Sequence, residues 1–309
     1  VDETVDLTAS CSDGTCLGSS PQTVTILDTT DQPTVTLNVG SLQINEIGGT
    51  TTAVTALLSS VSSKVVTVTI SKTNSTNAIE NADYTLGDTI TIPVLTSSAA
   101  ITFTVVHDLL DEVNETVTLN IIGVTNGTIG TPSQQIITIL DNDETPTVTL
   151  TVGASTIAES GATSTTGVTA TLSAPSGQVV TVFLTKSGTA TETATLAKTV
   201  DYTLGNSITI TLGASAATTT LLSVDDARDE SDTETVVIDI SSVTNADIFG
   251  GTQRQTVSIA DDDAPSIVTL SVASAIVNES GTTTNTIFTA TLTPVAGREV
   301  IVNLDTTGA

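Results

Sequence analysis

Apolar and polar side chains alternate with a period of two over many short stretches of this chain. Val66, Val68 and Ile70 alternate with threonines, and the same pattern returns around Phe103 and around Leu119. Alternation of this kind is typical of β-strands that have one buried face and one face in water. Within residues 33–145 it predicts strands near 34–39, 42–46, 51–58, 64–71, 88–95, 99–106, 116–122 and 135–140. No segment shows sustained helical periodicity, so the pattern indicates an all-β protein.

A second pattern, of apolar runs that end in acidic residues and a proline, repeats along the chain. It occurs at residues 139–146 and 259–265, with a looser copy at 26–33, so the period is about 115 residues. Asp83-Tyr-Thr-Leu-Gly likewise returns as Asp201-Tyr-Thr-Leu-Gly. We therefore divide the chain into the C-terminal part of a repeat (1–32), two complete repeats (33–145 and 146–264) and the N-terminal part of a further repeat (265–309). Because both outer pieces are incomplete, we expect the parent protein to be longer.

Each complete repeat has room for about seven or eight short strands, separated by turn residues such as Gly48-Gly49 and Asn126-Gly127. This number of strands in about 115 residues is typical of a two-sheet sandwich. We predict tandem immunoglobulin-like antiparallel β-sandwiches that form an elongated array. The second repeat is longer mainly between Lys186 and Asp201, where we expect a loop that varies around a common core.

The charge balance restricts the partners of the chain. It carries 34 acidic and 7 basic residues, which gives a formal net charge of −27. Binding to nucleic acid or to an anionic membrane surface requires clustered Lys and Arg, so we expect neither partner. No apolar run is long enough to span a bilayer, and we expect no direct membrane insertion of these residues. A negative charge of this size strains a fold by self-repulsion unless cations neutralise it.

Acidic residues recur at corresponding places in the two complete repeats, near the ends of predicted strands. Because the loops of a sandwich gather at its two ends, these carboxylates can converge. A hard cation relieves their repulsion, and Ca²⁺ suits flexible carboxylate-rich loops better than Mg²⁺. The alternative is that they are solvated loop charges that keep strand edges from aggregating. The candidates are Glu46, Asp83, Asp108, Asp111, Glu112, Glu115, Asp141 and Asp143 in the first complete repeat, and Glu159, Asp201, Asp225, Asp226, Asp229, Glu230, Glu234, Asp261, Asp262 and Asp263 in the second.

The two cysteines, Cys11 and Cys16, lie close together in the sequence. A zinc site would need two more soft ligands, and the only histidine, His107, lies in another repeat. We predict a local disulfide between Cys11 and Cys16, which favours an oxidising, extracytoplasmic setting. A pair of free surface thiols is the alternative.

Together, the early Glu, the Asp-Tyr pair, the Asp-Glu and Glu-Thr-Val segment and the terminal Ile-x-Asp-Asp-Asp run resemble the Calx-β repeat. This family is a calcium-binding β-sandwich of sodium/calcium exchangers, integrin β4 and many large bacterial surface proteins, and the resemblance covers nearly the whole chain. It implies Ca²⁺ at the end of each repeat that meets the next one. The ligands that it implies are Glu46, Asp83, Asp108, Asp111, Asp141 and Asp143, and Glu159, Asp201, Asp226, Asp229, Asp261 and Asp263.

Two positions distinguish the complete repeats. His107 stands where the second repeat has Asp225, and Asn142 stands where it has Asp262. We count Asp225 and Asp262 among the expected ligands, so we predict that the first complete repeat binds fewer ions or binds them more weakly. A cadherin-like array is the alternative for the fold, but the chain lacks the Leu-Asp-Arg-Glu element of cadherin repeats.

The residue types favour a binding protein over an enzyme. With one histidine the chain has no Ser/His/Asp or Cys/His system, so we expect no catalysis. Our main hypothesis is a rigid stalk or filament segment of an extracellular or cell-surface adhesin, with Ca²⁺ clamped at the junctions between neighbouring repeats. Other cell-surface or filament subunits are the further partners that this hypothesis suggests. The alternatives are a Ca²⁺-sensing regulatory module and a directly adhesive module.

Overall fold

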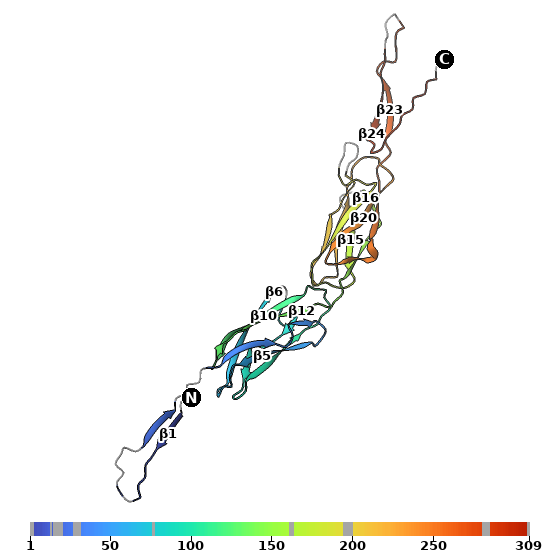
Figure 1. Cartoon of the computed structure of the whole chain (residues 1–309). Helices are drawn as coiled ribbons and strands as arrows, with labels where there is room; N and C mark the ends of the chain where they lie inside the picture. Colours follow the sequence, from blue (N-terminus) through green and yellow to red (C-terminus); the bar gives the residue numbers. More distant parts are fainter. Residues whose placement is uncertain are drawn as a thin grey trace. The chain divides into compact units, whose positions relative to one another are not determined.

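The computed structural model describes residues 3–12, 14, 21–26, 32–75, 78–160, 164–193, 200–279 and 285–307. By their contacts the residues form two units, Val1–Asp108 with Asn114–Asp141, and Leu109–Val113 with Asn142–Ala309. Strands and one short 3₁₀-helix, η1 (Phe249–Gly251), make up the regular structure of the described ranges (Figure 1). The predicted all-β class is therefore confirmed. Nothing helical in the described part of the chain has the length and apolar character needed to cross a membrane.

The first unit contains two five-stranded sheets. One sheet has the order β4 (Gln43–Asn45), β12 (Gln134–Leu140), β10 (Glu115–Thr125), β6 (Val66–Ser75) and β8 (Thr89–Ile92). The other has the order β11 (Thr128–Ile129), β3 (Thr34–Val39), β5 (Thr51–Leu58), β9 (Ser98–Val105) and β7 (Tyr84–Thr85). Neighbouring strands are antiparallel except for the pairs β4–β12 and β3–β11. Inward side chains of both sheets form one core, in which the rings of Tyr84 and Phe103 stack with centroids 4.9 Å apart.

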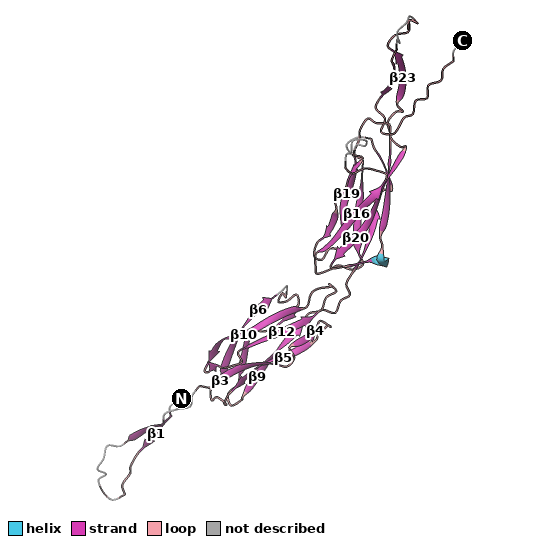
Figure 2. Ribbon diagram, turned by 45° about the horizontal axis from the view of Figure 1, so that its top comes forward, coloured by secondary structure: helices cyan, strands magenta, loops and turns pink. Residues whose placement is uncertain are grey.

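The second unit repeats this topology with a second core. Figure 2 shows its strands in magenta, with η1 in cyan. One sheet has the order β14 (Thr156–Ala158), β22 (Arg254–Ala260), β20 (Thr233–Thr244), β16 (Val180–Gly188) and β18 (Ser207–Ile210). The other has the order β17 (Tyr202–Thr203), β19 (Ala216–Ser223), β15 (Thr165–Leu172), β13 (Thr147–Val152) and β21 (Asp247–Ile248). Each unit is thus a β-sandwich, as the alternation of apolar and polar residues predicts.

Two further hairpins have the same pairing as strands inside the sandwiches. β1 (Glu3–Leu7) pairs with β2 (Gln22–Ile26) so that Glu3 faces Ile26, as Glu115 faces Ile139. β23 (Ile267–Val272) pairs with β24 (Phe288–Thr293) so that Val268 faces Leu292, as Val148 faces Leu172. The division of the chain into four pieces stays a prediction.

Every strand predicted for residues 33–145 overlaps an observed strand. Alternation did not predict β7 and β11, because each has only two residues and so cannot display a period. β6 continues beyond the predicted end and pairs with β10 across a bulge between Ile121 and Gly123. β7 matters for the site, because it places Tyr84 in the core directly after Asp83.

Candidate metal centre

In the second unit, backbone hydrogen bonds bring the acidic strand ends to one place. The amide of Glu159, just after β14, donates to the carbonyl of Ala260 at the end of β22 (2.8 Å). The carbonyl of Asp201, just before β17, accepts from the amide of Val224 after β19 (2.9 Å). Glu234 pairs with Ile259 across β20 and β22. Segments far apart in the sequence therefore place their carboxylates at one end of the sandwich.

Three of these carboxylates form a buried group. One oxygen from each of Asp201, Glu230 and Glu234 lies within 4.8 Å of the other two. The side chains are shielded from water, with exposed fractions of 1% for Asp201, 6% for Glu230 and 7% for Glu234. Like charges this close in a buried place repel strongly, so the group favours either protonation or a positive partner.

Glu159 lies beside this group, and the pKa of Glu159 responds to its negative charge. It is 3% exposed, and burial raises its pKa to about 8, with further contributions from the charges of Glu230, Asp226, Asp261 and Asp201. Burial likewise raises the pKa of Asp261 and of Asp263, and the neighbouring charges of Asp262 and Asp225 add to the effect at Asp263. The end of the sandwich is therefore a site where negative charge is held at an energetic cost.

Several carboxylates use one oxygen to fix the loop and present the other to the group. The amide of Thr191 donates to Oδ2 of Asp201 (2.5 Å), and the amide of Arg228 donates to Oδ1 of Asp226 (2.8 Å). Their second oxygens are shielded from solvent and accept no hydrogen bond from any residue that the structure describes. The same holds for Oε1 of Glu159, Oδ1 of Asp261 and Oδ2 of Asp263. Buried oxygens without donors are costly, and a bound cation removes that cost.

Asp229, one of the ligands that the resemblance implies, pairs with an arginine side chain. Nη2 of Arg298 lies 3.0 Å from its Oδ1 and 3.2 Å from its Oδ2, so both oxygens face a cation of the protein itself. Asp225 and Asp262 are exposed, and their charges act on the carboxyl group of Asp263. The exposed Asp225 and Asp262 thus differ from the shielded carboxylates of Asp201, Asp226, Asp261 and Asp263, and all of them stay predicted ligands.

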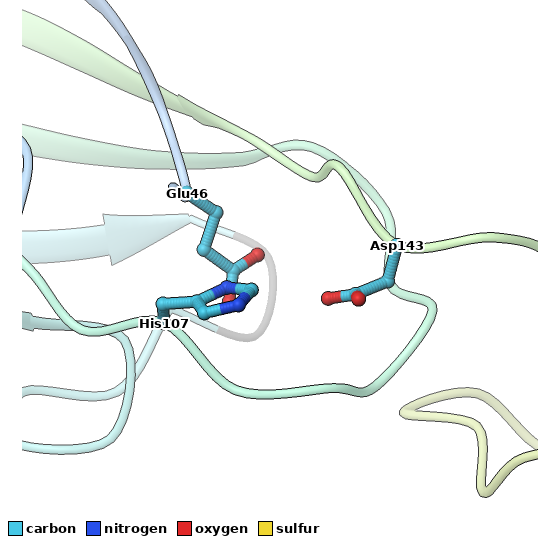
Figure 3. A group of neighbouring side chains, drawn as sticks. All are labelled: Glu46, His107 and Asp143. Carbon is cyan, nitrogen blue, oxygen red and sulfur yellow. The ribbon is translucent and has the colours of Figure 1, made fainter. Parts of the chain in front are cut away.

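In the first unit, the corresponding set is looser and contains the histidine. Oε1 of the buried Glu46 accepts a hydrogen bond from the amide of Asp108 (3.3 Å). An imidazole nitrogen of His107 lies within 4.8 Å of a carboxylate oxygen of Glu46 (Figure 3). The Glu46 amide donates to the carbonyl of Leu140, the residue before Asp141 (2.9 Å). Asp111 and Asp143, two further expected ligands, group with the second unit.

Asp83 belongs to the same end of the first unit. Burial raises its pKa, and the charge of Asp108 adds to the shift, whereas hydrogen bonds with the Ile79 amide and with Glu115 oppose it. The carboxylates of Asp83 and Glu115 lie within 4.8 Å of each other, as do those of Asp201 and Glu234 in the second unit. The two units therefore share this part of the arrangement.

Glu230 and Glu234 are candidate ligands because of their positions near strand ends. The resemblance does not include them in the ligand set that it implies. A signal for Glu234 is present in the sequence, because it stands in phase with Val236, Ile238 and Ile240 along β20. An acidic residue in phase with core positions must point inward. Glu115 stands in the same relation to Val117 and Leu119 on β10.

The predicted disulfide cannot be placed in the same way. Cys11 is among the described residues, but Cys16 lies outside them. The pairing of Cys11 with Cys16 therefore stays a prediction, as does the oxidising setting inferred from it.

No family model and no curated protein matches the sequence. Among solved structures, the chain resembles CBD12 from CALX1.2, with 14% identity over 71% of this chain and 96% of that chain, and a TM-score of 0.31. It also resembles the apo form of the Calx CBD1 domain, with 18% identity over 36% and 99% of the two chains and a TM-score of 0.31. The adhesin InvE of Yersinia pseudotuberculosis is similar at 13% identity over 73% and 58%, with a TM-score of 0.34. Calx domains are thus among the solved structures that this chain resembles.

Proposed function

We propose that the second unit binds Ca²⁺ at the acidic end of its sandwich. The ligands in this proposal are Glu159, Asp201, Asp226, Glu230, Glu234, Asp261 and Asp263. The observation that carries the proposal is the pair Glu159 and Asp201, two carboxylates at least nine-tenths buried, each with an oxygen that accepts no hydrogen bond from any described residue. Oxygens presented in this way are the ligands that a hard cation takes up.

Protonation is the competing explanation, and it is insufficient. With a pKa of about 8, Glu159 holds a proton at neutral pH and so relieves one charge of the group. Asp201, Asp226, Asp261 and Asp263 each keep a shielded oxygen in need of a positive partner. One dication with about six to eight oxygen ligands satisfies several of them together. Mg²⁺ fits less well, because it keeps a small octahedral shell with several waters.

The first unit has the same kind of end with fewer acidic side chains around it. His107 replaces Asp225, and Asn142 replaces Asp262. An imidazole nitrogen and an amide are weaker ligands for Ca²⁺ than carboxylates. We therefore assign the tighter site to the second unit and a weaker one to the first.

For the whole chain we propose a structural role, as calcium-stiffened Calx-β-like repeats of an extracellular or cell-surface protein. The recurrence of the acidic end in both units and the net charge of −27 support this role. Extracellular modules bind Ca²⁺ with a Kd of about 10⁻⁴–10⁻³ M, which suits permanent occupancy at high external calcium. A regulatory sensor would need a Kd of about 10⁻⁷–10⁻⁵ M.

Calorimetric titration of the full chain with CaCl₂ tests the binding site. We expect saturable binding that the double variant Asp201→Asn/Glu234→Gln abolishes in the second unit. Asp247→Asn is the matched control, because Asp247 is exposed on β21 and its loss changes the net charge without touching the group. Equal binding by the wild type and the double variant would overturn the proposal.

The same titration separates the stalk from the sensor, since near-millimolar affinity favours the first and submicromolar affinity the second. Small-angle scattering with Ca²⁺ and with EDTA tests the stiffening. We expect a narrower range of conformations with Ca²⁺, and identical profiles would exclude the stalk role while leaving the binding site intact.

A further inference from the structure

The pair Asp229-Glu230 contacts a turn at residues 296–298 in the second unit. The amide of Gly297 donates to the backbone carbonyl of Asp229 (2.9 Å). The guanidinium of Arg298 pairs with the Asp229 carboxylate, which is 5% exposed. The turn therefore contacts both the main chain and the side chain of one buried acid.

Gly297 is required by this contact. A Cβ atom at this position would lie 2.5 Å from Cγ and 2.6 Å from Oε1 of Glu230, which is far closer than real Cβ contacts. Glu230 is itself buried, so it has little room to move away. The absence of a side chain at residue 297 is what lets the turn lie against Glu230.

The same arrangement occurs a second time within the second unit, whose residues include Leu109–Val113. The amide of Gly177 donates to the carbonyl of Asp111 (3.1 Å), and Nε2 of Gln178 lies 3.5 Å from Oδ2 of Asp111. A Cβ atom at Gly177 would overlap the side chain of Glu112. Two copies of one contact share the Asp-Glu pair and the glycine and differ only in the donor side chain, Gln178 or Arg298, which indicates a recurring recognition element.

Strand pairing places these turns at equivalent positions in the repeats. Each turn follows a strand whose last apolar residue is a leucine. This leucine pairs with a valine on the neighbouring strand, Leu172 with Val148 and Leu292 with Val268. Glycine stands five residues after this leucine, and a residue with an N–H donor side chain stands six residues after it. Leu58 faces Val35 in the same way, and there Ser63 and Lys64 occupy the two positions.

We propose that the Asp-Glu pair is a docking site for the turn of the following repeat. The partner it takes is a turn with glycine, which fits under the glutamate, followed by a residue whose side chain donates to the aspartate. Arg298 forms a charge-assisted pair, so its turn docks more tightly than the turn with Gln178. In this assignment Asp111 and Asp229 hold turns and are not cation ligands, and the docking needs no bound ion.

Hydrogen–deuterium exchange on the full chain in EDTA tests the docking without any contribution from the proposed Ca²⁺ sites. In the wild type we expect slow exchange of the residue 297 amide, because it is bonded to Asp229. Gly297→Ala should speed this exchange by about tenfold or more, the factor that corresponds to losing one good hydrogen bond. Gly87→Ala is the matched control, since a Cβ there would meet only Cδ1 of Ile101 at 4.0 Å.

The rescue variant separates docking from a general effect of glycine loss. Glu230→Ala added to Gly297→Ala removes the overlapping side chain and should restore slow exchange at residue 297. Unchanged exchange in Gly297→Ala, or a double variant that exchanges as fast as the single one, would overturn the proposal. Exchange in β20 serves as the internal check that the sandwich is folded.

A gain-of-contact variant covers the case in which Gly297→Ala disturbs the fold. Gln178→Arg should give Asp111 the charge-assisted pair that Asp229 has, and should slow exchange of the Gly177 amide severalfold. Arg298→Ala should have the opposite effect on the Gly297 amide. If neither substitution changes the exchange of its turn, the side-chain part of the recognition is wrong.

Discussion

At the residue scale, the site depends on acidic side chains at positions that the strand pattern reserves for apolar ones. Glu234 points into the sandwich in phase with Val236 and Ile238, and Asp201 directly precedes the buried Tyr202. Apolar residues of similar volume at such positions would stabilise the cation-free fold. The presence of carboxylates at these positions therefore supports the proposed cation site.

The raised pKa of Glu159 predicts how pH affects the cation-free protein. A carboxyl group with a folded pKa of about 8 holds its proton more tightly in the folded state than in the unfolded state. Its contribution to stability is therefore complete below the unfolded pKa and is lost as the pH rises through about 8. In EDTA, we expect the melting temperature of the second unit to fall as the pH rises from about 4.5 to about 8.

The variant Glu159→Gln provides the comparison, because its side chain is neutral at every pH. Its melting temperature should depend less on pH between about 5 and 9, as measured by calorimetry in EDTA. Parallel pH profiles of the melting temperature for the wild type and the variant would contradict a raised pKa of Glu159 in the cation-free protein.

The histidine of the first unit gives a second prediction at this scale. His107→Asp restores the carboxylate found at Asp225, so it should raise the Ca²⁺ affinity of the first unit, by about tenfold for one added charged ligand. The reverse change, Asp225→His, should lower the affinity of the second unit. Calorimetric titration of both variants measures this, and unchanged affinities would place position 107 outside the site.

At the element scale, short edge strands position the proposed ligands. β7 has only two residues, yet Tyr84 stacks on Phe103 of β9 and so fixes Asp83 at the end of the sandwich. β17 places Tyr202 and Asp201 in the same way in the second unit. The packing of an aromatic ring thus determines where a carboxylate lies.

Removing the ring tests this dependence. Phe103→Ala should lower the free energy of unfolding of the first unit by about 3–5 kcal/mol and weaken its Ca²⁺ binding, because β7 loses its support. Phe183→Ala is the control, since Phe183 is 41% exposed on β16 and its truncation leaves no buried cavity. Urea denaturation measures the loss of stability, and calorimetric titration measures Ca²⁺ binding. Unchanged Ca²⁺ binding by Phe103→Ala would show that β7 is held in place without this ring.

At the scale of the whole molecule, the excess of negative charge makes the chain sensitive to cations of every kind. Monovalent salt screens the repulsion between surface charges, whereas a bound dication also satisfies the shielded oxygens. Screening depends on the total ionic strength and on no particular residue. Calcium binding saturates with the CaCl₂ concentration and depends on the proposed ligands.

Calorimetry at matched ionic strength separates them. Millimolar CaCl₂ should raise the melting temperatures above the values in NaCl of the same ionic strength, and ligand at about ten times its Kd adds about 1.4 kcal/mol of stability. Asp201→Asn/Glu234→Gln should remove the calcium-specific part for the second unit and keep the response to NaCl. An equal effect of both salts on the wild type would leave only screening.

The sequence by itself determined the class of fold and the regions that carry the chemistry. Alternation over Val66–Ile70 or Val117–Ile121 specifies which face of a strand is buried, since the period of a strand is two. The recurrence of Asp83 as Asp201 placed the candidate ligands at equivalent strand ends. Local sequence carries this information because strand periodicity and turn residues are local properties.

Only the tertiary structure decided which acids act together. Asp229 and Glu230 are neighbours in the sequence, yet Asp229 pairs with Arg298 while Glu230 joins Asp201 and Glu234. That division depends on the pairing of strands far apart in the chain and on a turn that approaches Glu230 only because residue 297 is glycine. Long-range contacts of this kind are set by packing, which no local pattern of residues encodes.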